Sequence, residues 1–250
     1  MGHERVGVLP KTKRWRAIVA EIAAADAPSS DVPEIARHTL DALGSRYAGL
    51  AAEASVGKAF EFLVDMARSA GGQDGAADIA QRSALSVVAE LGRALGFEGS
   101  RETAEIVKRA AADAIGTWAK DNATSQQELF SETAPSNRWA GLGTGAGFCE
   151  LSRLFFSRLT ERYLSYFLDR EASAALPSLE ARAQFGRELH LHLADISKHS
   201  FETAKITQSF AAGWYNKYAA KGKPTDQQIR DFLSYAFSKL REDLRREGRQ

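Results

Sequence analysis

Histidines and carboxylates gather in one stretch of the chain, between His190 and Glu202. Three of the five histidines lie within ten residues there. If the stretch is helical, one face carries, at spacings of three, four and three residues, His192, Asp195, His199 and Glu202. Imidazole and carboxylate groups on adjacent helical turns can hold a metal ion or exchange protons. The pattern therefore raises the hypothesis of a metal-dependent or acid–base enzyme.

The same face also fits ordinary helix packing. It adjoins the apolar positions Leu189, Leu193 and Ile196, and the edge of a packed face commonly carries half-buried polar side chains. Two-metal helical bundles place Glu before His at a spacing of three, whereas here His comes first. Elsewhere in the sequence no histidine clusters with carboxylates to supply further ligands. We therefore predict no metal and no cofactor, and keep the enzyme as an alternative.

Two other stretches combine basic and aromatic residues. The segment KTKRWR surrounds Trp15 with Lys13, Arg14 and Arg16 as well as Lys11. The segment WYNKYAAKGK follows Gly213 and contains three aromatic residues and three lysines: Trp214, Tyr215, Lys217, Tyr218, Lys221 and Lys223. Aromatic rings that stack on bases and cations that neutralise phosphate are the components of single-stranded nucleic-acid binding. Trp and Tyr are equally the residues that anchor protein interfaces.

The overall charge decides between these two partners. The 33 Lys and Arg residues are balanced by 32 Asp and Glu residues, so the net charge is only +1. A chain with so little charge has no general attraction for a polyanion. We therefore predict another protein as the partner, with nucleic acid as the alternative, and expect it to contact Trp15, Lys13, Arg14, Arg16, Trp214, Tyr215, Lys217 and Tyr218.

Two further motifs have simpler interpretations. The string GLGTGA, Gly141 to Ala146, matches part of a dinucleotide-binding fingerprint, but no strand pattern precedes it and no acidic residue follows on a second strand. We interpret it as a hinge before a helix that starts near Phe148. Cys149 is the only cysteine, which excludes an intrachain disulfide and a cysteine-based zinc site. A single thiol fits the reducing cytoplasm, where we expect the protein to be located.

The elements that would position these residues are helices. Prolines are few, runs of Val, Ile and Thr are rare, and apolar residues recur at spacings of three and four. The sequence predicts an all-α bundle of about eight helices with no sheet, the C-terminal helices being long. The predicted helices cover about 12–25, 33–49, 56–70, 76–96, 100–122, 148–171 and 177–213, and a last one that follows a capping box from Thr225 to Gln228.

The chain divides into three parts by composition. Residues 1–122 form an Ala-rich helical part, 123–147 a linker that contains Gly, Ser and Pro, and 148–250 an aromatic-rich helical bundle. The bulky residues of the last part bury more apolar area per helix. We expect it to be the more stable unit and the linker to be mobile.

A function follows mainly from what the sequence lacks. It contains no complete catalytic set and no phosphate-binding loop, and no run approaches the roughly 18 apolar residues of a membrane span. The all-helical chain is similar in character to accessory subunits of bacterial multi-protein systems, including anti-phage defence, although no motif carries this resemblance. We therefore predict a non-catalytic interaction or accessory subunit.

Overall fold

The computed structural model describes residues 13–24, 32–72, 79–96, 101–123, 137–176, 178–201 and 209–247. These ranges contain nine α-helices and no strand, so the all-α prediction is confirmed. The helices are α1 (Lys13–Ala24), α2 (Val32–Gly49), α3 (Ala54–Ala70), α4 (Ala84–Leu95), α5 (Arg101–Asn122), α7 (Gly145–Ala175), α8 (Leu179–Phe201), α9 (Phe210–Trp214) and α10 (Asp226–Glu247). A π-helix, η4 (Tyr215–Ala219), continues α9 directly.

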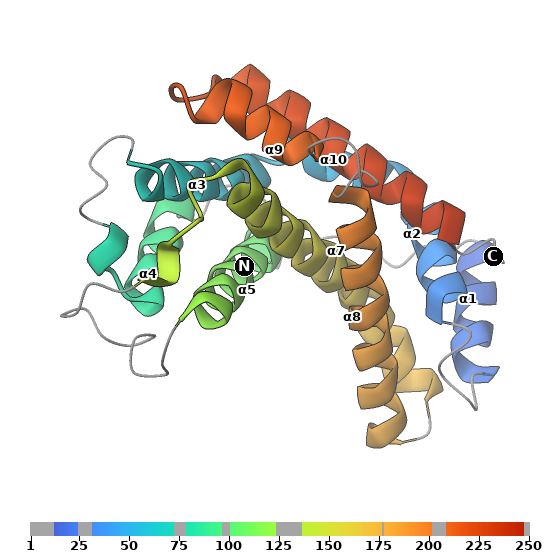
Figure 1. Ribbon diagram of the computed structural model, residues 1–250. Coiled ribbons are helices and arrows are strands. Elements are labelled where there is room, and N and C mark those ends of the chain that lie inside the picture. The colour runs from blue at the N-terminus through green and yellow to red at the C-terminus, as the bar shows by residue number, and fades with distance from the viewer. Residues whose placement is uncertain are drawn as a thin grey trace.

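Helix α7 is the central element of the molecule. It crosses the middle of the structure (Figure 1) and packs against α5, α8, α1, α9 and α3. Neighbours on several sides are possible because its apolar side chains cover most of its circumference. The side chains of α7 that are completely buried include Phe148, Leu151, Phe155, Phe156, Leu159, Leu164 and Phe167.

The residues just before α7 are packed against the N-terminal helices. The indole Nε1 of Trp118 in α5 donates to the carbonyl oxygen of Arg138 at 3.1 Å, and Nε1 of Trp139 donates to the carbonyl oxygen of Arg82 at 3.0 Å. Buried side chains on both sides of this segment belong to one hydrophobic cluster. Residues 124–136 lie outside the described ranges, and the division of the chain at 123–147 stays a prediction.

The glycine-rich loop is shaped by close backbone approaches. A Cβ atom on Gly143 would lie 2.2 Å from the Cα atom of Gly71, which follows α3, and a Cβ atom on Gly147 would lie 2.0 Å from the carbonyl oxygen of Gly141. Thr144 caps α7, because its Oγ1 accepts a hydrogen bond from the amide of Gly147 at 3.0 Å. Helix α7 therefore begins at Gly145, three residues before the predicted start.

The helix predicted over 177–213 is interrupted. Helix α8 ends at Phe201, and Ser209 has the extended dihedral angles φ −54° and ψ 152°. Its Oγ accepts from the amide of Ala212 at 3.2 Å and so caps a new helix, α9. The prediction of one continuous helix was wrong because a local serine cap competes with helix propagation.

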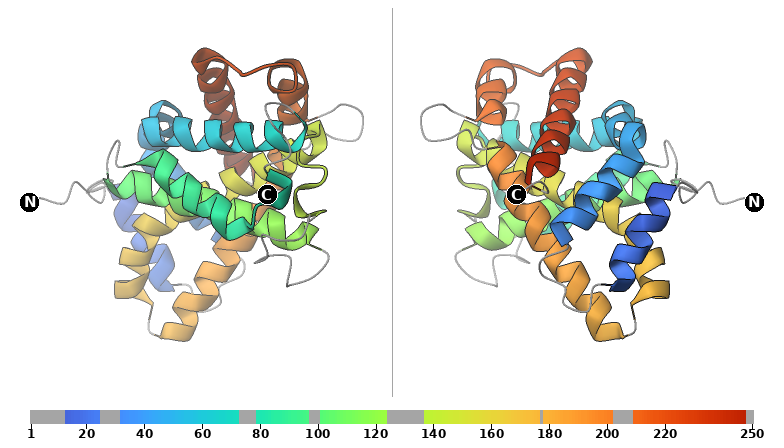
Figure 2. Two further views of the ribbon diagram at one scale, coloured as in Figure 1. Left: turned by 90° about the vertical axis from the view of Figure 1, so that its left-hand side faces the viewer. Right: turned by 90° about the vertical axis from the view of Figure 1, so that its right-hand side faces the viewer.

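The C-terminal segments form a helical hairpin. One arm is α9 with the π-helix η4, and the other is α10. The arms stand above α3 in Figures 1 and 2, and aromatic rings of the two arms contact each other between them. The predicted capping box starts α10, since the amide of Thr225 donates to Oε1 of Gln228 at 2.9 Å and the amide of Gln228 donates to Oγ1 of Thr225 at 3.3 Å. We call this unit the C-terminal hairpin.

The close approach of the glycine loop to α3 can be tested with a matched pair of substitutions. Gly143→Ala should lower the free energy of unfolding by about 1–3 kcal/mol, because the new methyl group meets backbone atoms that have to move. Gly186→Ala in α8 adds the same group where no atom lies within 4 Å, and should raise the free energy by up to about 1 kcal/mol. Urea unfolding of both variants measures this, and equal stabilities would refute the tight contact.

Candidate functional site

The two arms of the C-terminal hairpin enclose a pocket of about 270 Å³. The first arm contributes side chains spaced by four residues, and the second contributes one face of α10. Together the lining consists of Phe210, Trp214, Tyr218, Gln228, Asp231, Phe232 and Tyr235. Five of these seven residues are aromatic, and we call the site the aromatic pocket.

The rings of the pocket contact one another in a chain. Phe232 is buried at the base, where its ring centroid lies 4.9 Å from that of Trp214 and 5.3 Å from that of Phe210. Tyr218 lies 5.9 Å from Trp214, and Tyr235 lies 4.7 Å from Phe210 in an edge-on arrangement. The outer rings are partly exposed, Tyr235 by 53%. The pocket is therefore an open aromatic surface on a packed base.

Several polar atoms of the pocket are unused. Nε2 of Gln227 donates to Oδ1 of Asp231 at 2.7 Å. Within the described residues, Oδ2 of Asp231 has no hydrogen-bond or ion-pair partner, and the same holds for Nε1 of Trp214 and for the hydroxyl groups of Tyr218 and Tyr235. No described residue occupies these atoms, so they can bond a ligand.

The π-helix that carries Tyr218 is held by the rest of the protein. Tyr215 is 1% exposed and stacks on Phe148 of α7, with ring centroids 4.8 Å apart. Nη1 of Arg68 in α3 donates to the carbonyl oxygen of Ala219, at the end of the π-helix, at 3.0 Å. A π-helix fits more residues into a turn than an α-helix and is frequent at functional sites. These contacts fix one side of the π-helix to the core and leave Trp214 and Tyr218 for the pocket.

The sequence-predicted residues of this stretch therefore divide into two groups. Trp214 and Tyr218 line the pocket, and the exposed Lys217 places its Nζ 4.7 Å from the centroid of the Tyr218 ring. Tyr215 lies on the opposite side, where burial raises the pKa of its hydroxyl group. Neighbouring positions on a helix point in different directions, so the four residues could not share one surface.

The sequence interpretation missed the residues that α10 and the start of α9 contribute: Phe210, Gln228, Asp231, Phe232 and Tyr235. The spacing of Gln228, Asp231, Phe232 and Tyr235 along one helical face was the available signal.

The N-terminal basic–aromatic stretch has a different environment. Trp15 is 3% exposed, and its ring lies 6.4 Å from that of Phe167 in an edge-on arrangement. Lys13 and Arg16 are exposed on α1, whereas the side chain of Arg14 lies outside the described part of the structure. The indole of Trp15 thus contributes to the core and not to an open surface.

Within the described part of the structure, no second set of ligands lies beside His192 on α8. This imidazole is half-buried, burial lowers its pKa, and its Nε2 atom is buried without a hydrogen-bond partner. Asp195 is exposed; the side chain of His199 and all of Glu202 lie outside the described residues. Nδ1 of His190 instead pairs with Oε2 of Glu161 in α7 at 2.7 Å. Nowhere in the described ranges do three His, Cys, Asp or Glu side chains gather as metal ligands would.

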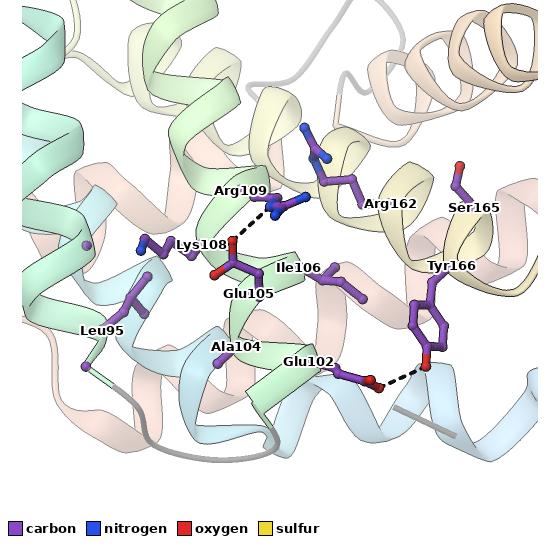
Figure 3. A pocket seen from close by; sticks show the side chains of 12 residues that line it. Leu95, Glu102, Ala104, Glu105, Ile106, Lys108, Arg109, Arg162, Ser165 and Tyr166 are labelled. Atoms are coloured by element: carbon purple, nitrogen blue, oxygen red, sulfur yellow. Dashed lines mark hydrogen bonds and ion pairs between the residues drawn. The ribbon is translucent and has the colours of Figure 1, made fainter. Parts of the chain in front are cut away.

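A larger groove of about 610 Å³ follows α5 between α4 and α7 (Figure 3). Its acidic and basic side chains mostly pair within the protein. Nε of Arg109 donates to Oε1 of Glu105 at 2.8 Å, and the Tyr166 hydroxyl donates to Oε2 of Glu102, also at 2.8 Å. Nε of Arg162, whose guanidinium group also lies between α5 and α7, donates to Asp113 at 3.0 Å. Because its charges are largely compensated, we favour the aromatic pocket as the functional site.

The two faces of the π-helix should differ in their contribution to stability. Tyr215→Ala should lower the free energy of unfolding by about 3 kcal/mol or more, because it removes a buried ring stacked on Phe148. Tyr218→Ala should change it by about 1 kcal/mol or less, because that ring is half-exposed. Chemical unfolding of the two variants tests the assignment, which similar losses would contradict.

His192 should make stability depend on pH. Because burial lowers its folded-state pKa below the ordinary 6.5, the unfolded chain takes up a proton first as the pH falls. Acidification through about pH 6.5 should therefore destabilise the wild type relative to His192→Gln, and the difference between the two proteins should be constant above about pH 7.5. Urea unfolding across this range measures the effect. A difference that does not change with pH would show that His192 titrates normally.

Comparisons with known proteins do not identify a function for the site. No family model, no curated protein and no solved structure matches the chain. No helix in the described ranges has the length and hydropathy needed to cross a bilayer. The function is therefore argued from the geometry of the aromatic pocket.

Proposed function

We propose that this protein is a non-catalytic interaction subunit that binds a segment of another protein in the aromatic pocket. The observation that carries the proposal is the composition of the pocket, in which five aromatic residues surround about 270 Å³ of open space. Trp and Tyr dominate the binding energy of protein interfaces because each ring buries a large area while its polar atom forms a hydrogen bond. Trp214, Tyr218 and Tyr235 offer such rings, with N–H or O–H groups that have no partner among the described residues.

The packing of the pocket supports tight binding. Trp214 contacts Phe60 and Phe148 as well as Phe232, with ring centroids between 4.9 and 6.1 Å apart. A ring held by several neighbours loses little conformational entropy when a ligand binds. The pocket therefore resembles a preorganised anchor site more than a loose apolar patch.

Nucleic acid is a less suitable ligand for this site. Among the described residues that line the pocket, Asp231 is the only charged one, and its carboxylate repels phosphate groups. In the N-terminal stretch, Trp15 is buried and offers no ring for a base to stack on. Nucleic-acid binding would have to rely on exposed basic residues such as Lys13, Arg16 and Lys221 alone.

An enzyme remains the other alternative, but no second observation supports it. His192 has no carboxylate from another helix beside it among its described contacts, and its buried Nε2 has no hydrogen-bond partner. General acid–base catalysis needs at least one group within reach of the reacting atoms of a substrate. The described lining of the aromatic pocket contains a single carboxylate and no histidine or cysteine.

The wider setting of the proposal comes from the sequence. The single cysteine favours a reducing compartment, so we propose a cytoplasmic location. We also propose a role in a bacterial multi-protein system, such as anti-phage defence. This part of the proposal is supported only by the all-helical character of the chain.

Selection of peptides from a displayed random library on the immobilised protein tests the proposal. We expect the selected peptides to bind the wild type and to lose roughly thirtyfold in affinity with Tyr218→Ala or Tyr235→Ala, because a central aromatic residue of an interface typically contributes about 2 kcal/mol. Leu191→Ala is the matched control, since Leu191 on α8 is 66% exposed and distant in sequence from the hairpin.

The melting temperature of each variant separates loss of binding from loss of folding. The Tyr218→Ala and Tyr235→Ala variants should melt close to the wild type, because the first ring is half-exposed and the second is exposed. If no peptide is enriched, or if the selected peptides bind the tyrosine variants as well as they bind the wild type, the aromatic pocket is not the interaction site.

A further inference from the structure

We infer that the aromatic pocket binds an alkylammonium group, supplied by a lysine side chain of the partner protein. The identity of the carrier rests on the proposed function, whereas the preference for a cation rests on the pocket itself. A general apolar docking surface would accept a neutral alkyl group equally well, whereas this pocket should prefer a positively charged one.

The lining supplies both interactions that a cation needs. The faces of aromatic rings carry negative electrostatic potential, and cations within about 6 Å of a ring centroid are attracted to them. Phe210, Trp214, Tyr218 and Tyr235 present partly exposed rings around the cavity. Among the described residues, no basic side chain belongs to the lining of the pocket.

Asp231 supplies the counter-charge. Its carboxylate belongs to the lining, and one oxygen accepts a hydrogen bond from Gln227 at 2.7 Å. The other oxygen has no partner among the described residues. A group of rings beside one carboxylate is an arrangement that selects an ammonium group over a neutral alkyl group of the same shape.

The protein itself already places a cation on one of these rings. Nζ of Lys217 lies 4.7 Å from the centroid of the Tyr218 ring. Lys217 does not belong to the lining, so its ammonium group leaves the cavity to a ligand. Because it contacts a shared ring, it should also repel an entering cation to some extent.

The test compares two small probes of the same shape. Choline carries a trimethylammonium group, and in 3,3-dimethylbutan-1-ol a carbon atom replaces the nitrogen, so only the charge differs. Binding is followed by nuclear magnetic resonance through the indole N–H signal of Trp214, which Trp214→Phe assigns. We expect choline to shift this signal saturably and the alcohol to shift it little.

Charge variants locate the counter-ion. Asp231→Asn keeps a group that accepts the Gln227 hydrogen bond and removes the charge, and should weaken choline binding by about fivefold. Asp226→Asn removes an exposed carboxylate of the same helix from outside the lining and should leave the affinity unchanged. Lys217→Gln should strengthen binding, and added salt should weaken it in the wild type.

To test lysine as the source of the ammonium group, the probes are Nα-acetyl-lysine methylamide, whose ε-amine is free, and the corresponding norleucine compound, which lacks that amine. The lysine compound should bind and the norleucine compound should not. If choline binds while the lysine compound does not, the ligand is a free quaternary amine and the assignment to a lysine side chain is wrong.

The outcomes also separate this inference from the proposed function. Equal shifts by choline and the alcohol, or an unchanged affinity in Asp231→Asn, would overturn the cation site. If selected peptides without Lys then still require Tyr218 and Tyr235 for binding, the docking of a protein segment in the pocket stands without the cation preference. Choline binding that depends on Asp231, without any enriched peptide, would instead keep the cation preference and remove the protein partner.

Discussion

The stacking of Tyr215 on Phe148 is the contact on which the architecture of the C-terminal half depends. Phe148 lies in the first turn of α7 and also contacts Phe60 of α3 at 5.9 Å and Trp214 at 5.8 Å. One ring thereby joins an N-terminal helix, the central helix and the C-terminal hairpin. Each aromatic pair adds about 0.5–1.5 kcal/mol beyond the area that it buries. Once Tyr215 is fixed in the core, the rotation of the π-helix is fixed, and with it the outward direction of Tyr218.

Small residues make this junction possible. Gly143 lets the loop before α7 touch the end of α3, and a Cβ atom on Gly145 would lie 2.8 Å from the side-chain amide of Asn216 in the π-helix. Arg68, 4% exposed, donates to the carbonyl oxygen of Ala219 and so satisfies a group that the end of the helix leaves without an intrahelical partner. The glycine string that looked like part of a nucleotide-binding loop therefore serves the close packing of three segments.

The two candidate sites show what a pattern on a single helix can establish. His192 and Asp195 lie on one face, as their spacing requires, yet one is half-buried, with a lowered pKa, and the other is exposed. A chemical site needs groups that converge from different elements. The aromatic pocket meets that condition, since Trp214 and Phe232 come from two arms of a hairpin and contact each other at 4.9 Å.

The sequence by itself determined the helical class, most helix positions and the capping box at Thr225, because these follow from periodicity and local hydrogen bonds. It also singled out the segment that contains Trp214 and Tyr218. Only the tertiary structure decided that Ser209 starts a new helix, that Tyr215 faces inward, and that Asp231 and Tyr235 join the pocket. Periodicity reports that a helix has an apolar face, but the partner of that face is chosen by packing between elements that lie far apart in the chain.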